Sequence, residues 1–176
     1  AGLCLKKLFR AASHKALSIQ EGGMIVLISW IVAVVFSALP FMFLLGHTFA
    51  QAVFEAVSGW TTTGLSTVDV NKAGPMILLW RSITQLAGGA GLAVIMMSAI
   101  VGPTGAGISI AEGRGDQLVP QVRQSARLVL IIYAGYALVG TLSYRAVGMS
   151  FFDAVNHTFA AISTGGFSTH AESIGY

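Results

Sequence analysis

Two short runs of threonine, serine and glycine carry the oxygen atoms that are best suited to bind an ion in this sequence. The runs are residues 61–65 (TTTGL) and 163–167 (STGGF), and neither contains an acidic residue. A cation could therefore be held there only by backbone carbonyls and hydroxyls, which is how selectivity filters replace the hydration shell of K⁺. Glycine permits the unusual dihedral angles that point successive carbonyls at one axis. We expect Leu65 and Phe167 to pack behind such loops and to hold their diameter.

Each run ends a longer segment that occurs twice, 102 residues apart. Residues 49–69 align without a gap on residues 151–171 and share seven identical positions, most of them in the pattern T-x-G-x-S-T. In each copy a helix-forming stretch precedes the Thr/Gly run, and at about 16 Å it is too short to cross a bilayer. Irregular polar backbone at membrane depth is tolerated only where it lines a cavity or is buried in protein. We interpret both copies as re-entrant pore loops; the alternative is an external loop with an interfacial helix.

The composition indicates that these loops belong to a membrane protein. The 176 residues are 55% hydrophobic and only 10% charged, whereas soluble domains are about 25% charged. The apolar content excludes a disordered chain, and the single Cys4 excludes a disulfide scaffold. Three stretches are long enough to span a bilayer, at residues 24–45, 76–101 and 128–147. The expected fold is an all-α integral membrane protein.

The basic residues predict how the chain is oriented. Residues 1–23 and 102–127 hold seven lysines and arginines, whereas the opposite side has Lys72 and Arg145. By the positive-inside rule the first two segments are cytoplasmic. We therefore expect a basic cytoplasmic segment (1–23), a first helix–pore-loop–helix repeat (24–101, pore helix and filter 49–67), a cytoplasmic connector (102–127) and a second repeat truncated after its filter (128–176, filter region 151–169).

These motifs in combination resemble the Trk/Ktr/HKT superfamily of potassium transporters, and especially its TrkH-type membrane subunits. The resemblance rests on the TTTG and STGGFSTH loops, on W-R-S-x-x-Q-x-x-G-G at residues 80–89, and on the tail 148–176. It implies a potassium-channel-like architecture with four repeats around one pore. By analogy, one filter quarter would be formed by Thr62, Thr63 and Gly64, and the next by Thr164, Gly165 and Gly166. Two quarters cannot surround an ion, so we expect the chain to be a fragment of a longer protein.

The resemblance also implies partners. Members of this superfamily work as homodimers in the bacterial cytoplasmic (inner) membrane and are gated by a cytosolic nucleotide-binding ring of the TrkA type. The expected function is K⁺ uptake, with K⁺ as the transported ion, no cofactor in this chain, no enzymatic activity and no nucleic-acid partner. The alternatives are the potassium-binding subunit of a K⁺-pumping ATPase and a non-conducting structural membrane module. Because the first loop has the single glycine Gly64, we expect modest selectivity for K⁺ over Na⁺.

Other polar residues admit more than one interpretation. Arg81 lies inside the second span, where a charge marks a functional site unless its side chain reaches the interface. Gln85 lies one turn further on and could share its polar environment. Gly88, Gly89 and Gly91 favour close helix packing over gating. Finally, Asp153, His157 and Ser163 offer the residue types of a hydrolase triad without an oxyanion element, so polarity of the helix surface explains them better.

Overall fold

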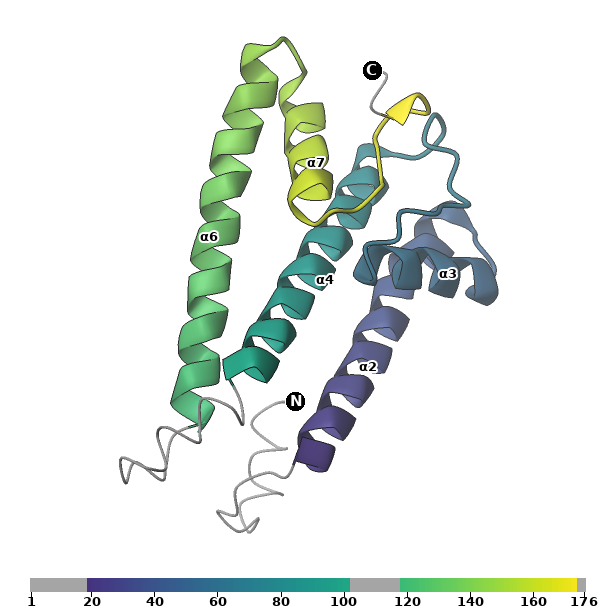
Figure 1. The fold of residues 1–176 in the computed structure, drawn as a ribbon. Coiled ribbons are helices and arrows are strands. Elements are labelled where there is room, and N and C mark those ends of the chain that lie inside the picture. Colours follow the sequence, from purple (N-terminus) through teal and green to yellow (C-terminus); the bar gives the residue numbers. More distant parts are fainter. Residues whose placement is uncertain (1–18, 102–117, 174–176) are drawn as a thin grey trace, which may run out of the picture. The chain divides into compact units, whose positions relative to one another are not determined.

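The computed structural model describes residues 19–101 and 118–173, and within them the chain is built from helices. In chain order these are α2 (Ile19–Leu45), α3 (Phe49–Trp60), α4 (Pro75–Val101), α6 (Leu118–Ala146) and α7 (Phe151–Ile162) (Figure 1). The expected all-α fold is confirmed. The chain divides into two compact units at Ala33/Val34, inside α2. All the contacts described below lie within the second unit.

Three of the described helices are long and apolar enough to cross a membrane. Their candidate spans are Gln20–Leu45, Pro75–Val94 and Ala126–Ala146, with mean hydropathies of 2.5, 1.2 and 1.6. These spans fall in the three stretches that the sequence predicts. The second span is the least apolar because it carries Arg81 and Gln85 among its glycines.

α6 begins at Leu118, so its first residues lie within the expected cytoplasmic connector 102–127. Pro120 lies in the first turn, where proline is tolerated since its missing N–H would have no partner in the helix. The apolar span starts only at Ala126, so the helix extends beyond the segment that hydropathy identifies. Residues 1–18 and 102–117, with most of the basic side chains that orient the chain, lie outside the described residues, and the orientation stays a prediction.

The two short helices expected at the start of the repeated segments are present and equal in length. Both α3 and α7 have 12 residues, and their first residues are 102 positions apart. Thr48 caps α3 by accepting from the backbone N–H of Gln51 (3.4 Å), and Ser150 caps α7 by accepting from that of Asp153 (3.1 Å). Such caps satisfy N–H groups that have no partner within the helix. At about 18 Å, each helix is too short to span a bilayer.

α7 runs back alongside α6, and the segment after it returns toward the end at which α7 began (Figure 1). The chain thus reverses direction after α7, as the sequence predicts for a re-entrant loop. α4, the last helix of the first repeat, contacts α3 of its own repeat and both α6 and α7 of the second.

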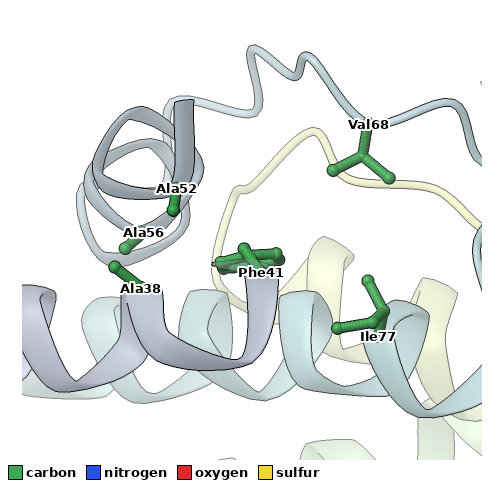
Figure 2. Packing of buried hydrophobic residues seen from close by; sticks show 6 residues of the cluster. All are labelled: Ala38, Phe41, Ala52, Ala56, Val68 and Ile77. Carbon is green, nitrogen blue, oxygen red and sulfur yellow. The ribbon is translucent and has the colours of Figure 1, made fainter. Parts of the chain in front are cut away.

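A small apolar core joins the second half of α2 to α3 and the start of α4. Figure 2 shows Ala38 and Ala56 facing each other, with Phe41 beside them. Ala38, Phe41 and Ala56 are all 0% exposed. Small side chains let two helices approach closely, which is how helices pack within membranes. The core therefore fixes the short helix against the preceding span.

Glycines of α4 make the contact with the ends of both short helices. A Cβ on Gly88 would overlap the backbone carbonyl of Trp60, at the end of α3, and a Cβ on Gly89 would lie 3.0 Å from the Cα of Ser163, just after α7. Gly91 has open space around it. The packing interpretation thus holds for Gly88 and Gly89, and Gly91 has no such contact with the part of the chain that the structure describes. These two glycines bring one span directly against both loops.

Candidate functional site

α3 and α7 end in the same hydrogen-bonded cap, from which the Thr/Gly loops emerge. At the end of α3, the N–H groups of Thr62 and Thr63 donate to the carbonyls of Gly59 (3.0 Å) and Ser58 (3.0 Å). The equivalent groups of α7, 102 positions later, form the same two bonds at 3.2 and 2.8 Å. Crossed bonds of this kind define the Schellman motif, which satisfies the last carbonyls of a helix. The repeat seen in the sequence is therefore also a repeat of backbone geometry.

Threonine occupies the position in this cap that is usually glycine. Thr62 has φ 56° and Thr164 has φ 55°, so both adopt the left-handed conformation. A β-branched residue is uncommon there, and the strain costs about 1–3 kcal/mol. Strained residues of this kind cluster at functional sites. That both copies keep threonine here points to a role for this backbone shape beyond ending a helix.

The two loops meet at their glycines. Gly64 has φ +82°, and a Cβ placed on it would lie 2.5 Å from the Cα and 2.6 Å from the nitrogen of Gly166. A Cβ placed on Gly166 would lie 3.2 Å from the Cα of Gly64. Gly64 therefore has no room for a side chain, and a side chain at Gly166 would require the backbone of Gly64 to shift slightly. The structure thus brings together two segments that are 102 residues apart in sequence.

Gln85 of α4 holds the second loop. Its side chain is 0% exposed, and its amide oxygen, oriented toward the loop, accepts from the N–H groups of Gly166 (3.1 Å) and Phe167 (3.2 Å). That orientation is assigned from the hydrogen-bond partners, which it satisfies on both sides of the amide. A Cβ on Gly165 would overlap this amide. Gln85 therefore packs against the loop backbone rather than facing lipid.

Leu65 and Phe167, which we expect to pack behind their loops, differ in exposure within this chain. Phe167 is 3% exposed, but Leu65 is 63% exposed. Phe167 lies under α4, with the guanidinium of Arg81 4.1 Å above its ring. No described residue covers the Leu65 side chain in this way. The backbone carbonyl of Leu65 accepts a hydrogen bond from the Ser58 hydroxyl (2.5 Å). The first loop is thus held through its backbone, and the second also through its side chain.

Glu55 is a site residue that the sequence patterns did not identify. It lies in the middle of α3, is 0% exposed, and binds the segment that follows the first loop. Its carboxylate accepts from the hydroxyls of Ser66 (3.0 Å) and Thr67 (3.1 Å) and from the N–H groups of Thr67 and Val68, the latter at 3.2 Å. An acidic residue inside an otherwise apolar short helix is the signal that could have identified it.

Arg81 is buried, which excludes the interpretation that its side chain extends to the membrane surface. It is 2% exposed, and its Nε lies 3.8 Å from a carboxylate oxygen of Glu55. Its Nη2 donates to the Ser66 hydroxyl (2.8 Å), and its Nη1 donates to the backbone carbonyl of Ser168 (3.2 Å). One guanidinium therefore contacts the segments that follow both loops.

A carboxylate also binds the segment that follows the second loop. It belongs to Asp153, which lies on α7 one turn before the position equivalent to Glu55. Asp153 accepts from the Thr169 hydroxyl (2.6 Å) and pairs with His170 (3.2 Å). Burial acts to raise the pKa of the Asp153 carboxyl, but the hydrogen bonds from Ser150 and Thr169 and the nearby His170 together hold it below its ordinary value. Asp153 thus holds the turn that follows the second loop through two of its side chains.

The hydrolase arrangement has no support in this geometry. Ser163 is 3% exposed, and its hydroxyl donates to the carbonyl of Phe159 (2.7 Å) within the cap of α7. Asp153 is committed to Thr169 and His170, as described above. Ser163 and Asp153 therefore bond within the second short helix and the segment that follows it.

Taken together, the described residues define a class of protein. They form a multi-pass helical membrane protein built from helix–loop–helix repeats. Its features are three candidate spans, two helices too short to span a bilayer, and two loops that meet at their glycines.

The family follows from comparison with known sequences. A profile of the TrkH family, described as cation transport protein, matches residues 3–176, and the chain belongs to this family. The chain is 37% identical over 166 residues to the Trk system potassium uptake protein TrkG of Escherichia coli strain K12, covering 89% of this chain and 34% of that relative. It is 34% identical over 173 residues to the Trk system potassium uptake protein TrkH of Halomonas elongata, covering 93% and 36%.

A solved structure has the same fold. The crystal structure of the potassium transporter TrkH from Vibrio parahaemolyticus matches with a TM-score of 0.79 and 31% identity, over 99% of this chain and 36% of that one. The chain thus spans about a third of the length of the relatives it matches.

Proposed function

We propose that this chain supplies two filter segments of a pore that carries K⁺ across the membrane. The observation that carries this proposal is the meeting of two loops with the same strained cap, each at the end of a short helix, through Gly64 and Gly166. The relatives named as potassium uptake proteins support K⁺ as the ion. The filter residues of this proposal are Thr62, Thr63 and Gly64 in the first loop and Thr164, Gly165 and Gly166 in the second.

The mechanism needs no covalent chemistry. Both short helices direct their C-terminal ends at the loops, and such an end carries about half a negative charge. With no acidic side chain in either run, carbonyl and hydroxyl oxygens replace part of the hydration shell of the ion. Binding without a full negative charge is weak enough to let the ion leave, which conduction requires.

The complete pore requires more than this chain. We propose that the remaining filter segments come from the rest of a longer protein, since the chain covers about a third of its relatives. The whole protein would form a homodimer in the bacterial inner membrane and be gated by a cytosolic, TrkA-like nucleotide-binding subunit. Residues 1–23 and the connector after α4 would face the cytoplasm.

The proposal is tested by rubidium uptake in cells that lack their own potassium uptake and express the full-length protein. Gly166→Ser places a side chain against Gly64, so we expect Rb⁺ uptake to fall and its competition by K⁺ over Na⁺ to weaken. Gly135→Ser is the matched control, because a Cβ added to Gly135 on α6 would have nothing within 4 Å.

Both variants must reach the membrane in equal amounts. Uptake by Gly166→Ser that equals the unmodified protein in rate and in ion preference would refute the filter and leave the loops as structural turns.

A further inference from the structure

Arg81 lies between two residues that the repeat makes equivalent. Its guanidinium contacts Ser66 through the hydroxyl and Ser168 through the backbone carbonyl, and these serines are 102 positions apart. Each serine forms the same local turn, with its Oγ accepting from the N–H two residues later, Val68 or His170, at 3.0 Å. One side chain therefore spans corresponding points of the two repeats, two residues beyond Gly64 and Gly166.

The Ser66 hydroxyl forms hydrogen bonds with both Glu55 and Arg81. The Ser66 hydroxyl donates to Glu55 (3.0 Å) and accepts from Arg81 (2.8 Å) and from the N–H of Val68 (3.0 Å). A hydroxyl has one donor and two acceptor sites, so its capacity is filled. Arg81 and Glu55 are 3.8 Å apart at their nearest atoms, too far for a direct hydrogen bond. The serine thus couples the two charges.

Burying this pair is costly unless its geometry is fixed by further bonds. Glu55 and Arg81 are 0% and 2% exposed, and the gain from a buried ion pair often does not exceed the cost of desolvating it. Such pairs are weak evidence for stability, and one attested use is to specify a single arrangement. Here the arrangement that the pair specifies is the distance between the two loops, because Arg81 also binds Ser168 and stacks on Phe167.

We propose that Glu55 and Arg81 are positioning residues that set ion selectivity by fixing the first filter segment relative to the second. This inference rests on the proposed function of the loops as a filter. Arginine is required because its planar fork reaches Ser66 with one terminal nitrogen and Ser168 with the other, which the single ammonium of lysine cannot do. The bridge is one-sided, since the position equivalent to Glu55 in α7 is His157.

The test compares Rb⁺ and Na⁺ uptake by the full-length protein with Arg81→Lys and with Ser66→Ala. Arg81→Lys keeps the charge and removes the fork, and Ser66→Ala removes the hydroxyl and leaves both charges in place. We expect each to lower the Rb⁺-to-Na⁺ uptake ratio by about threefold to tenfold, the equivalent of one typical hydrogen bond, at unchanged membrane abundance. Arg145→Lys is the control, because Arg145 is exposed and bonds only locally, to the carbonyl of Met149 (2.8 Å).

Gly166→Ser, measured in parallel, separates the two proposals. If Gly166→Ser alters the ratio and both Arg81→Lys and Ser66→Ala leave it unchanged, the loops form a filter and the positioning role is wrong. If none of the three alters it, the filter itself is wrong. A fall in membrane abundance with an unchanged ratio in the protein that remains would show that the pair serves folding alone, and would also overturn the inference.

Discussion

Gly64→Ala is the change that most directly probes the contact between the two loops. Two separate penalties meet at this position: the left-handed φ of +82° and the lack of space beside Gly166. The chain offers a control for each penalty. Gly46 has φ +66° and nothing within 4 Å of an added Cβ, whereas Gly166 has an ordinary φ but a Cβ contact at 3.2 Å.

The expected magnitudes follow from these distances. An alanine in the left-handed region costs about 1–2 kcal/mol. A Cβ at 2.5 Å from the Cα of Gly166 forces the backbone to move, and overpacking of this kind costs about 1–3 kcal/mol. Gly64→Ala should therefore destabilise the protein by about 2–5 kcal/mol, and Gly46→Ala by only the first of these amounts. Gly166→Ala should lie at the low end of the second range, since a contact at 3.2 Å requires a smaller shift.

The assay is the apparent Tm of the purified full-length protein in detergent, with Rb⁺ uptake as the functional readout. Gly64→Ala should lower Tm the most and reduce uptake, while Gly46→Ala should lower Tm slightly and leave the ion preference intact. Equal Tm values for Gly64→Ala and Gly46→Ala would refute the reasoning, because only the dihedral penalty would then be real and the loops would not touch.

Two further predictions concern how the short helices are held. Ser37→Ala removes the hydroxyl that accepts from the Trp60 indole (2.8 Å), which should cost about 0.5–1.5 kcal/mol for the loss of one hydrogen bond; Ser37→Thr keeps a hydroxyl, and equal Tm values for the two variants would contradict this. Asp153→Asn should lower Tm at neutral pH, because the native carboxylate has a lowered pKa and its contribution is present above the ordinary value of 3.8. That contribution is lost only as the pH falls through the lowered pKa, so the Tm difference from the unmodified protein should persist from pH 8 down to pH 5, and a difference that vanishes near pH 6 would show that another group is responsible.

The strained caps suggest why the loops keep threonine where glycine would be easier. Glycine at positions 62 and 164 would relieve the left-handed strain and would also widen the range of backbone conformations. A filter needs carbonyls held in one arrangement, and a β-branched side chain narrows the choices open to the backbone. The strain at Thr62 and Thr164 therefore accompanies a loop backbone that is held in one conformation.

Much of the architecture is a local property of the sequence and could be predicted from it. Long apolar stretches predict the spans, although Arg81 and Gln85 interrupt the second, and the period of 102 residues predicts two equivalent loops because the same residues favour the same caps. The short helices begin after Thr48 and Ser150 and end before Thr61 and Ser163, as helix-capping chemistry dictates.

The tertiary structure alone decided which residues work together. Arg81 could be placed in a span from sequence, but its burial depends on Glu55, Ser66 and Ser168, which local patterns cannot bring together. The meeting of Gly64 with Gly166 likewise depends on α4 packing against both short helices through Gly88 and Gly89.

The difference between Leu65 and Phe167 shows the same limit. The two positions are equivalent in the repeat, yet among the described residues Phe167 is covered and Leu65 is exposed, because α4 and Arg81 lie over the second loop. The sequence by itself determined the spans and the repeat, since these depend on neighbours along the chain. The tertiary structure decided how the two loops are held together, because that depends on one buried helix that contacts them both.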